Sequence, residues 1–255
     1  MRKYIVIVIS IIVAILSVVI FNGSKQNKSE IMIKVGENKK ISMENYMCNV
    51  IISEMWDYND VEALKAFCII VRSNIMYSLL EDTDNILDKD NICLPYKNVN
   101  FNNKKYNSIK EKVKGIINDT EGEVATYSNR IINLPYHKIS AGKTINTLDN
   151  GNVIPYLKST RCDKDIENSN YLKIFYYDYG NNNIELKTKV INEINNSYEK
   201  CNIDDMGERL RIVEQGEGHN YGMSLYSAYK MSKEGHTYID ILNKFYNIKI
   251  VRVYN

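Results

Sequence analysis

The stretch that decides the fold runs from Ile41 to Ser73 and reads ISMENYMCNVIISEMWDYNDVEALKAFCIIVRS. In its first half, Ser42 is a suitable N-cap, and apolar residues recur at helical spacing as far as Met55, which predicts a helix. The letters WDYND interrupt this pattern. A second helix is predicted from apolar residues three or four positions apart: Val61, Leu64, Cys68, Val71, Ile75 and Leu79. The two helices are expected to form an antiparallel hairpin about the interruption.

Two glutamates flank the predicted turn. Glu54 lies at the end of the first helix, where the negative end of the helix dipole disfavours a charged carboxylate. Glu62 lies in the first turn of the second helix, where a negative charge is favourable, and Asn59 with Glu62 resembles a capping box. Glu54 is therefore the better candidate for an acid that holds a proton.

Two cysteines lie ten residues either side of Tyr58, which is in the predicted turn. In an antiparallel hairpin, Cys48 and Cys68 would lie at the same height. Packed helix axes are about 8–10 Å apart, whereas a disulfide needs Cα atoms within about 7 Å. We therefore expect two neighbouring free thiols, with Cys93, Cys162 and Cys201 also unpaired.

The remaining patterns favour the α+β fold class. Residues 31–35 alternate as in a strand, residues 106–119 repeat apolar side chains at helical spacing, and the segment from Glu123 contains two strands around Ser128 and Asn129. Residues 150–205 are rich in asparagine and give no clear pattern. The expected architecture is an N-terminal transmembrane helix and one mixed helix and strand extracellular domain, with two lobes about a groove as one option.

The N-terminus predicts a membrane anchor. Tyr4 to Phe21 carries no charge and spans about 18 residues, enough to cross a hydrocarbon core as a helix. A cleaved signal peptide is the alternative, but the run is followed by no small-residue cleavage site. Arg2 and Lys3 precede it and favour a cytoplasmic N-terminus. We expect a cytoplasmic tip and anchor at 1–21, a linker at 22–30 and an extracytoplasmic domain at 31–255.

Composition argues against several other classes. With 33 basic and 31 acidic residues, the formal charge is +2, which does not favour nucleic-acid binding. Gly216, Gly218 and Gly222 do not have the spacing of a nucleotide-binding loop. The histidines at positions 137, 219 and 236 are too far apart to form a local metal site, so neither a metal nor a cofactor is expected.

Three separated segments carry a family resemblance. They are Ile41–Ser73, quoted above, then YHKISAGKT at Tyr136–Thr144, and GEGHNYGMSLYSAYKMSKEGHTYIDILNKFY at Gly216–Tyr246. In order and spacing they resemble the stage II sporulation protein D family, exported peptidoglycan lytic transglycosylases of spore-forming bacteria. This sequence has Trp56 where the family has proline and Phe67 where it has glutamine.

The resemblance implies roles for individual residues. The catalytic glutamate of the family falls on Glu54. The positions implied for substrate binding are Lys65, Arg72, His137, Ser140, Gly142, Gly218, His219, Gly222, Ser224 and Tyr226. A glycine-rich loop suits such a site, because glycine allows the backbone to come close to sugar rings.

The resemblance also implies an activity. The expected enzyme is a lytic transglycosylase that cleaves the MurNAc–GlcNAc bond of peptide-stripped glycan strands during engulfment and leaves 1,6-anhydroMurNAc ends. The implied partners are a membrane-anchored amidase and a polytopic sporulation membrane protein. The alternative is a catalytically weak or inactive peptidoglycan-binding protein of the same fold, similar to an amidase enhancer.

Overall fold

The computed structural model describes residues 31–81, 94–97, 104–148, 151–180, 183–195 and 200–254. The predicted anchor at 1–21 and linker at 22–30 lie outside these ranges. From Met32 onward the chain forms one compact unit. Its helices are α2 (Met43–Met55), α3 (Val61–Glu81), α4 (Lys104–Asp119), α5 (Ile184–Asn195), α6 (Leu225–Lys233) and α7 (Tyr238–Phe245), with a 3-10 helix, η1 (Asp163–Glu167).

The described strands are short and form four small sheets. Their bounds are β1 (Met32–Gly36), β2 (Lys39–Ser42), β3 (Glu123–Tyr127), β4 (Arg130–Ile131), β5 (Tyr136–His137), β6 (Leu172–Asp178), β7 (Lys200–Asp205), β8 (Arg209–Gln215), β9 (Met223–Ser224) and β10 (Lys249–Arg252). The sheet orders are β1-β2, β10-β3-β4, β5-β9 and β6-β8-β7. The predicted mixture of helices and strands is confirmed, whereas the two-lobed form stays a prediction.

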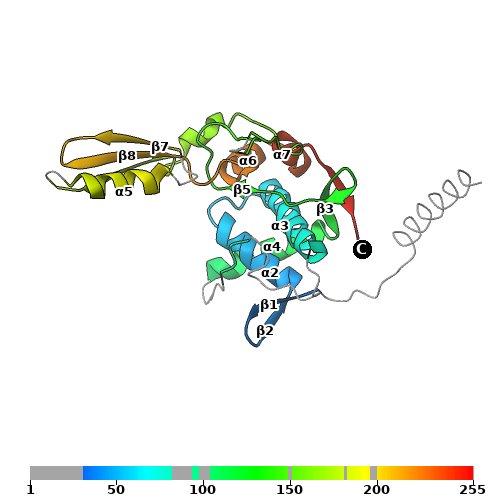
Figure 1. Cartoon of the computed structure of the whole chain (residues 1–255). Helices are drawn as coiled ribbons and strands as arrows, with labels where there is room; N and C mark the ends of the chain where they lie inside the picture. Colours follow the sequence, from blue (N-terminus) through cyan, green and yellow to red (C-terminus); the bar gives the residue numbers. More distant parts are fainter. Residues whose placement is uncertain are drawn as a thin grey trace, which may run out of the picture. The chain divides into compact units, whose positions relative to one another are not determined.

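The predicted hairpin of α2 and α3 is confirmed (Figure 1). The Ser42 hydroxyl accepts a hydrogen bond of 3.3 Å from the backbone N–H of Asn45, so Ser42 caps α2 as expected. The capping box of Asn59 and Glu62 is wrong. Asp60, not Asn59, immediately precedes α3 and accepts the first helical hydrogen bond, from Leu64, so Glu62 is one residue too close to the cap to complete the box.

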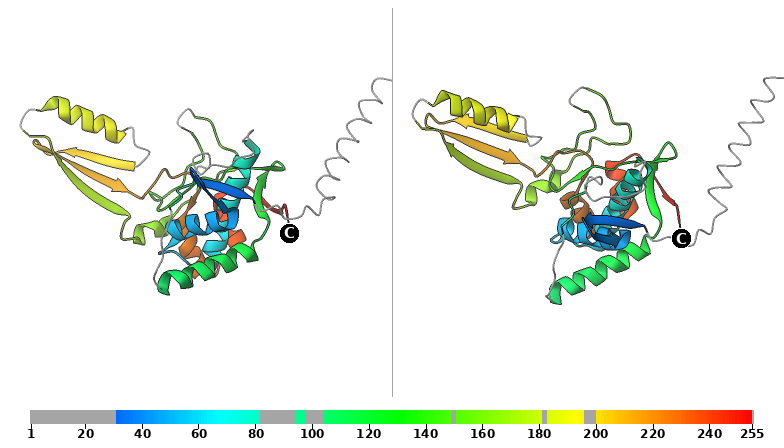
Figure 2. Two further views of the ribbon diagram at one scale, coloured as in Figure 1. Left: turned by 90° about the horizontal axis from the view of Figure 1, so that it is seen from below. Right: turned by 60° about the horizontal axis from the view of Figure 1, so that its bottom comes forward.

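Helix α3 is the centre of the core, and it packs against α2, α4, α6, α7 and β3 (Figure 2). Its residues from Ala63 to Ile75 are almost fully buried apart from Lys65. Among the described residues, only Val61–Leu80 within α3 is long and apolar enough to cross a membrane. Because two thirds of its most apolar stretch is buried inside the protein, we interpret α3 as a core helix.

The predicted strand pair around Ser128 and Asn129 is confirmed as β3 and β4. Both turn residues have positive φ, 51° and 62°, the conformation of a two-residue type I′ hairpin loop. The region without a clear pattern contains β6, β7 and α5. There α5 lies along the sheet β6-β8-β7, and a small core forms from Tyr179, Val190, Leu210 and Ile212 (Figure 1).

The thiols of Cys48 and Cys68 are free and buried, as predicted, and Cys68 is close enough to contribute to the raised pKa of Cys48. Burial raises the pKa of Cys48 to about 11, so this thiol is inert at neutral pH. Cys162 is also a buried free thiol. Cys93 lies outside the described residues.

Candidate active site

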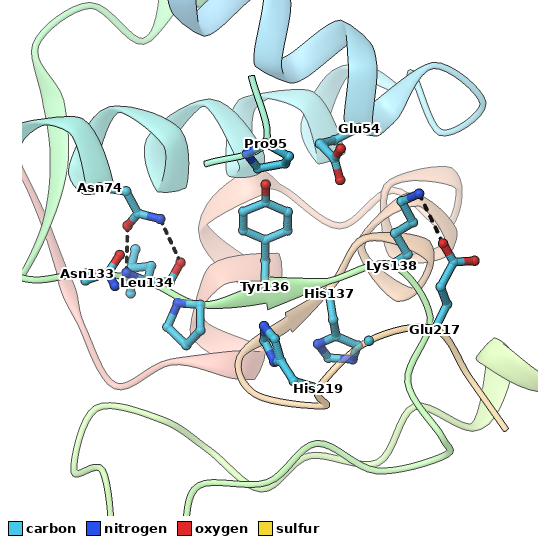
Figure 3. Close-up of a pocket in the computed structure, with 12 residues that line it drawn as sticks. Glu54, Asn74, Pro95, Asn133, Leu134, Tyr136, His137, Lys138, Glu217 and His219 are labelled. Atoms are coloured by element: carbon cyan, nitrogen blue, oxygen red, sulfur yellow. Dashed lines mark hydrogen bonds and ion pairs between the residues drawn. The ribbon is translucent and has the colours of Figure 1, made fainter. Parts of the chain in front are cut away.

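A pocket of about 440 Å³ brings together residues from all three family-like segments. It is lined by Glu54, Asn74, Pro95, Asn133, Leu134, Pro135, Tyr136, His137, Lys138, Glu217, Gly218 and His219 (Figure 3). Of the residues implied by the family resemblance, Glu54, His137, Gly218 and His219 therefore line one cavity. The others lie elsewhere.

Glu54 projects into the pocket from the last turn of α2 (Figure 3). Burial raises the pKa of its carboxyl group, and the nearby ammonium groups of Lys138 and Lys97 counteract only part of that effect. The expected elevated pKa is thus confirmed, although its main cause is burial rather than the helix dipole. A carboxylic acid in this environment keeps its proton at a higher pH than an ordinary glutamate and can donate it to a ligand.

Successive side chains of the short strand β5 point to opposite faces, as in any β-strand. Tyr136 and Lys138 point to the side of Glu54, and His137 points to the opposite side, toward His219 (Figure 3). Strand β5 pairs in parallel with β9, so that His137 lies beside Ser224. This pairing places the Tyr-His motif next to the glycine-rich motif, although the two are far apart in the sequence.

Tyr246 stabilises this junction. Its buried hydroxyl accepts a hydrogen bond of 2.9 Å from the N–H of Met223 and donates one of 2.6 Å to the carbonyl of Pro135. One side chain from the end of α7 therefore holds the starts of both β5 and β9. The positions of the pocket histidines depend on this contact.

Lys138 and Glu217 form an ion pair of 3.1 Å beside Glu54 (Figure 3). Lys173 contacts the other carboxylate oxygen of Glu217 at 3.4 Å. Burial favours the neutral acid, but the two ammonium groups outweigh it and hold the pKa of Glu217 below its ordinary value. The pocket therefore contains two carboxyl groups whose pKa values are displaced in opposite directions.

The two histidines lie with ring centroids 5.9 Å apart. His137 is almost fully buried, and burial lowers its pKa to about 3; burial also lowers the pKa of His219. Nδ1 of His137 contacts the carbonyl oxygen of Tyr221 at 3.1 Å. Both rings are consequently neutral at physiological pH and serve as hydrogen-bonding groups rather than cations.

Two glycines of the motif are required by the backbone. Gly218 has φ of 111°, and a Cβ there would lie 2.9 Å from the Cβ of His137. Gly222 has φ of 68°, and a Cβ there would collide with the carbonyl oxygen of Pro135. Gly218 therefore lets the loop pass close to His137 at the pocket, whereas Gly222 lets the chain enter β9.

Ser140 and Ser224, both implied as substrate contacts, are instead buried around Asp165. The Ser224 hydroxyl donates a hydrogen bond of 2.6 Å to Oδ2 of Asp165, and the N–H of Ser140 donates one of 2.5 Å to the same atom. Both serines are 0 % exposed, so a glycan cannot reach them. They stabilise the loop and the start of α6, where Ser224 is the N-cap.

Lys65 and Arg72 do not line the pocket either. Lys65 pairs with Glu62 at 3.0 Å on the side of α3 that faces α7. Arg72 is 1 % exposed and donates to the carbonyl oxygens of Ile117 and Glu123, at 3.0 and 3.1 Å. Its cation thus meets the negative end of α4 and contributes to stability rather than to a binding surface.

Gly142 and Tyr226 lie outside the pocket lining as well. Gly142 has φ of 93° in the loop after Ser140. Tyr226 packs edge-on against Tyr58, with ring centroids 5.5 Å apart, and its N–H donates to the carbonyl of Lys138. It borders the pocket through the Lys138 backbone.

Sequence reasoning missed Tyr136, Lys138 and Glu217 as pocket residues. The alternation of a strand was a usable signal for the first two, because residues on either side of His137 must share the opposite face. Glu217 gave no such signal, since its role depends on ion pairs with residues distant in the sequence. Among the described residues, no group of three or more histidine, cysteine or acidic side chains could hold a metal ion.

These features define a class: an α+β protein in which a protonatable glutamate at a helix end shares a pocket with an ion-paired carboxylate and two neutral histidines. Residues 33–127 match the family model described as Stage II sporulation protein. The chain is 25% identical to stage II sporulation protein D of Bacillus subtilis, with 82% of this chain and 74% of the relative covered. Stage II sporulation protein D of Bacillus amyloliquefaciens is also 25% identical, with 82% and 73% covered. Residues 33–127 thus match the domain of that family, and most of the chain is similar to stage II sporulation protein D.

Proposed function

We propose that this protein is a peptidoglycan lytic transglycosylase that cleaves the MurNAc–GlcNAc bond, with Glu54 as its acid and base. The observation that carries the proposal is the position of Glu54. Its side chain is half-buried at the end of α2 and faces the pocket, and the pKa of its carboxyl group is raised. The substrate would be glycan strands stripped of peptides, and the reaction would serve engulfment during sporulation.

The proposed reaction needs one carboxylic acid. Glu54 first protonates the oxygen of the leaving sugar. As a carboxylate, it then accepts the proton of the muramic C6 hydroxyl while the C6 oxygen attacks the anomeric carbon. The bond to the leaving sugar breaks, the 1,6-anhydro bond forms, and the acid is regenerated. An elevated pKa suits both steps, because the group must donate and accept a proton near the working pH.

The environment of Glu217 supports this assignment. Hydrolysing glycosidases normally use a second carboxylate as a nucleophile or as a base toward water. Both oxygens of Glu217 are engaged by ammonium groups, at 3.1 Å from Lys138 and 3.4 Å from Lys173. Such pairing lowers the basicity of a carboxylate, so Glu54 is the only pocket carboxyl group, among those described, with an environment suited to proton transfer.

Replacement of Glu54 by glutamine tests the proposal. The amide keeps the shape of the side chain but cannot donate and recover a proton in this way. We expect at least about a 10²-fold loss of anhydro-ended products from purified peptide-stripped strands, measured by mass spectrometry, with unchanged circular dichroism. Glu111→Gln is the matched control, because Glu111 lies on α4 with its side chain 73% exposed. Glu54→Gln activity near that of the wild type would exclude Glu54 as the acid.

A wild-type protein that binds the strands but releases no products would instead support the non-catalytic wall-binding function. The proposed partners are a membrane-anchored amidase, which would supply stripped strands, and a polytopic sporulation membrane protein. We further propose that the apolar run from Tyr4 to Phe21 stays uncleaved as an anchor with the domain outside. Protease treatment of intact protoplasts should then digest the domain, and release of a soluble form that starts near residue 24 would contradict the anchor.

A further inference from the structure

Tyr221 determines the tautomers of both pocket histidines through its own backbone. Its carbonyl oxygen lies 3.1 Å from Nδ1 of His137, and its N–H donates a hydrogen bond of 3.0 Å to Nδ1 of His219. A carbonyl oxygen only accepts, so Nδ1 of His137 carries a hydrogen. A backbone N–H only donates, so Nδ1 of His219 carries none.

Because burial keeps both rings neutral, each has a single N–H, and the two are opposite tautomers. Nε2 of His137 is left with a lone pair and can accept a hydrogen bond. Nε2 of His219 carries the hydrogen and can donate one. The pair thus offers an acceptor and a donor on two rings 5.9 Å apart, both of which line the pocket.

Nε2 of His137 is buried and has no hydrogen-bond partner within the part of the chain that the structure describes. A buried acceptor without a partner is costly, and a ligand N–H that reaches it recovers that cost. Because this atom is buried in the structure, neighbouring side chains are expected to move when a ligand enters. An unpaired buried acceptor beside a fixed donor indicates a ligand group with both functions.

We propose that His137 and His219 bind the 2-acetamido group of a sugar, whose N–H donates to His137 and whose carbonyl accepts from His219. This inference rests on the proposed function, which supplies N-acetylated sugars as the substrate. The acetamido methyl group would lie against Pro135, a partly exposed apolar residue of the same pocket.

An amide fits this arrangement better than a hydroxyl group. A hydroxyl donates and accepts through one oxygen atom, whereas an amide places its donor and acceptor on two atoms that face different directions. Two separate rings with fixed and opposite roles match the second pattern. A hydrogen-bonding site of this kind rejects analogues that lack the group, because its polar atoms are then left unpaired.

The test compares two neutral sugars with the same β-1,4-linked backbone. Chitotetraose carries a 2-acetamido group on each ring, and cellotetraose carries a hydroxyl there. In full-length Glu54→Gln protein, which measures binding without turnover, we expect chitotetraose to bind at least about tenfold more tightly by calorimetry. His219→Phe should reduce that ratio to about twofold or less, and His219→Gln, whose amide can still donate, should retain part of it. Equal affinities, or a full ratio in His219→Phe, would overturn the proposal.

A second measurement does not depend on a substituted chain. Imidazole nitrogen-15 spectra should show the hydrogen on Nδ1 of His137 and on Nε2 of His219, and identical tautomers would contradict the inference. Failure of the two proposals can be told apart. A wild-type chain that discriminates between the sugars but forms no anhydro ends leaves only the proposed reaction in error. A chain that forms them without discriminating leaves only the acetamido site in error.

Discussion

The ammonium group of Lys138 lies 3.1 Å from the carboxylate of Glu217, and both residues line the pocket into which Glu54 projects. Each of the two charges acts on Glu54: Lys138 lowers its pKa and Glu217 raises it, while burial is the larger effect. Tyr136 is coupled to the same group, since the charge of Glu54 adds to the burial that raises the tyrosine pKa. The protonation of Glu54 is thus adjusted by the neighbouring ion pair.

The ion pair predicts two opposite shifts in the pH profile. If protonated Glu54 is the active form, activity falls as pH rises through its pKa. Glu217→Gln removes a negative neighbour and should move this basic limb to lower pH by roughly half a unit to one unit. Lys138→Met removes a positive neighbour and should move the limb to higher pH by a similar amount. Initial rates of anhydro-product formation between pH 4 and about 9 decide the matter, and shifts of the same sign would exclude this electrostatic account.

Gly222 should not tolerate a side chain. Its φ of 68° disfavours any residue with a Cβ, and the added atom would collide with the carbonyl oxygen of Pro135. We expect Gly222→Ala to lower the free energy of unfolding by about 2–4 kcal/mol. Gly115→Ala on α4 is the control, because a Cβ there meets nothing within 4 Å, and it should stabilise the protein by about 0.5–1 kcal/mol. Thermal unfolding in detergent measures both, and a neutral Gly222→Ala would show that the β5–β9 junction is less rigid than described.

Arg72 should matter for stability and not for glycan binding. Arg72→Met removes the donors to Ile117 and Glu123 and should cost about 2–4 kcal/mol. Arg72→Lys keeps the charge but not the forked geometry and should recover only part of that loss. The affinity of the folded fraction for stripped strands should stay within about twofold, since the side chain is buried outside the pocket. A selective loss of affinity at unchanged melting temperature would return Arg72 to the substrate-binding residues.

Local patterns were sufficient to predict α2, α3 and the turn between β3 and β4, because helical periodicity and turn chemistry depend on neighbouring residues. Because the end of α2 could be predicted, the position of Glu54 at that helix end could be predicted as well. The same reasoning could not separate Ser224 or Arg72 from true pocket residues. Their motif positions resemble those of the family, yet their partners, Asp165 and the α4 carbonyls, are far away in the sequence.

The sheet β6-β8-β7 illustrates a second limit. Strand β6 has exposed apolar residues on both faces, including Ile174, Phe175 and Tyr176, so it lacks the alternation that would have identified it. Its register with β8 depends on long-range pairing, such as Tyr176 with Arg211. The pocket depends on pairing of the same kind between β5 and β9, and for that reason its full membership could not be predicted.

Ser224 and Ser227 both donate to the buried carboxylate of Asp165, at 2.6 and 2.5 Å, and Ser224 also caps α6. Ser224→Ala therefore removes two interactions and should lower the free energy of unfolding by about 1–3 kcal/mol. Ser227→Ala removes one and should cost less, about 1 kcal/mol, because alanine also favours the helix. Because the two serines donate to the two oxygens of one carboxylate, the double substitution should not be additive. Glycan affinity measured below the melting transition should be unchanged in all three variants. A loss of affinity in Ser224→Ala at wild-type stability would instead make Ser224 a substrate contact, as the family resemblance implies.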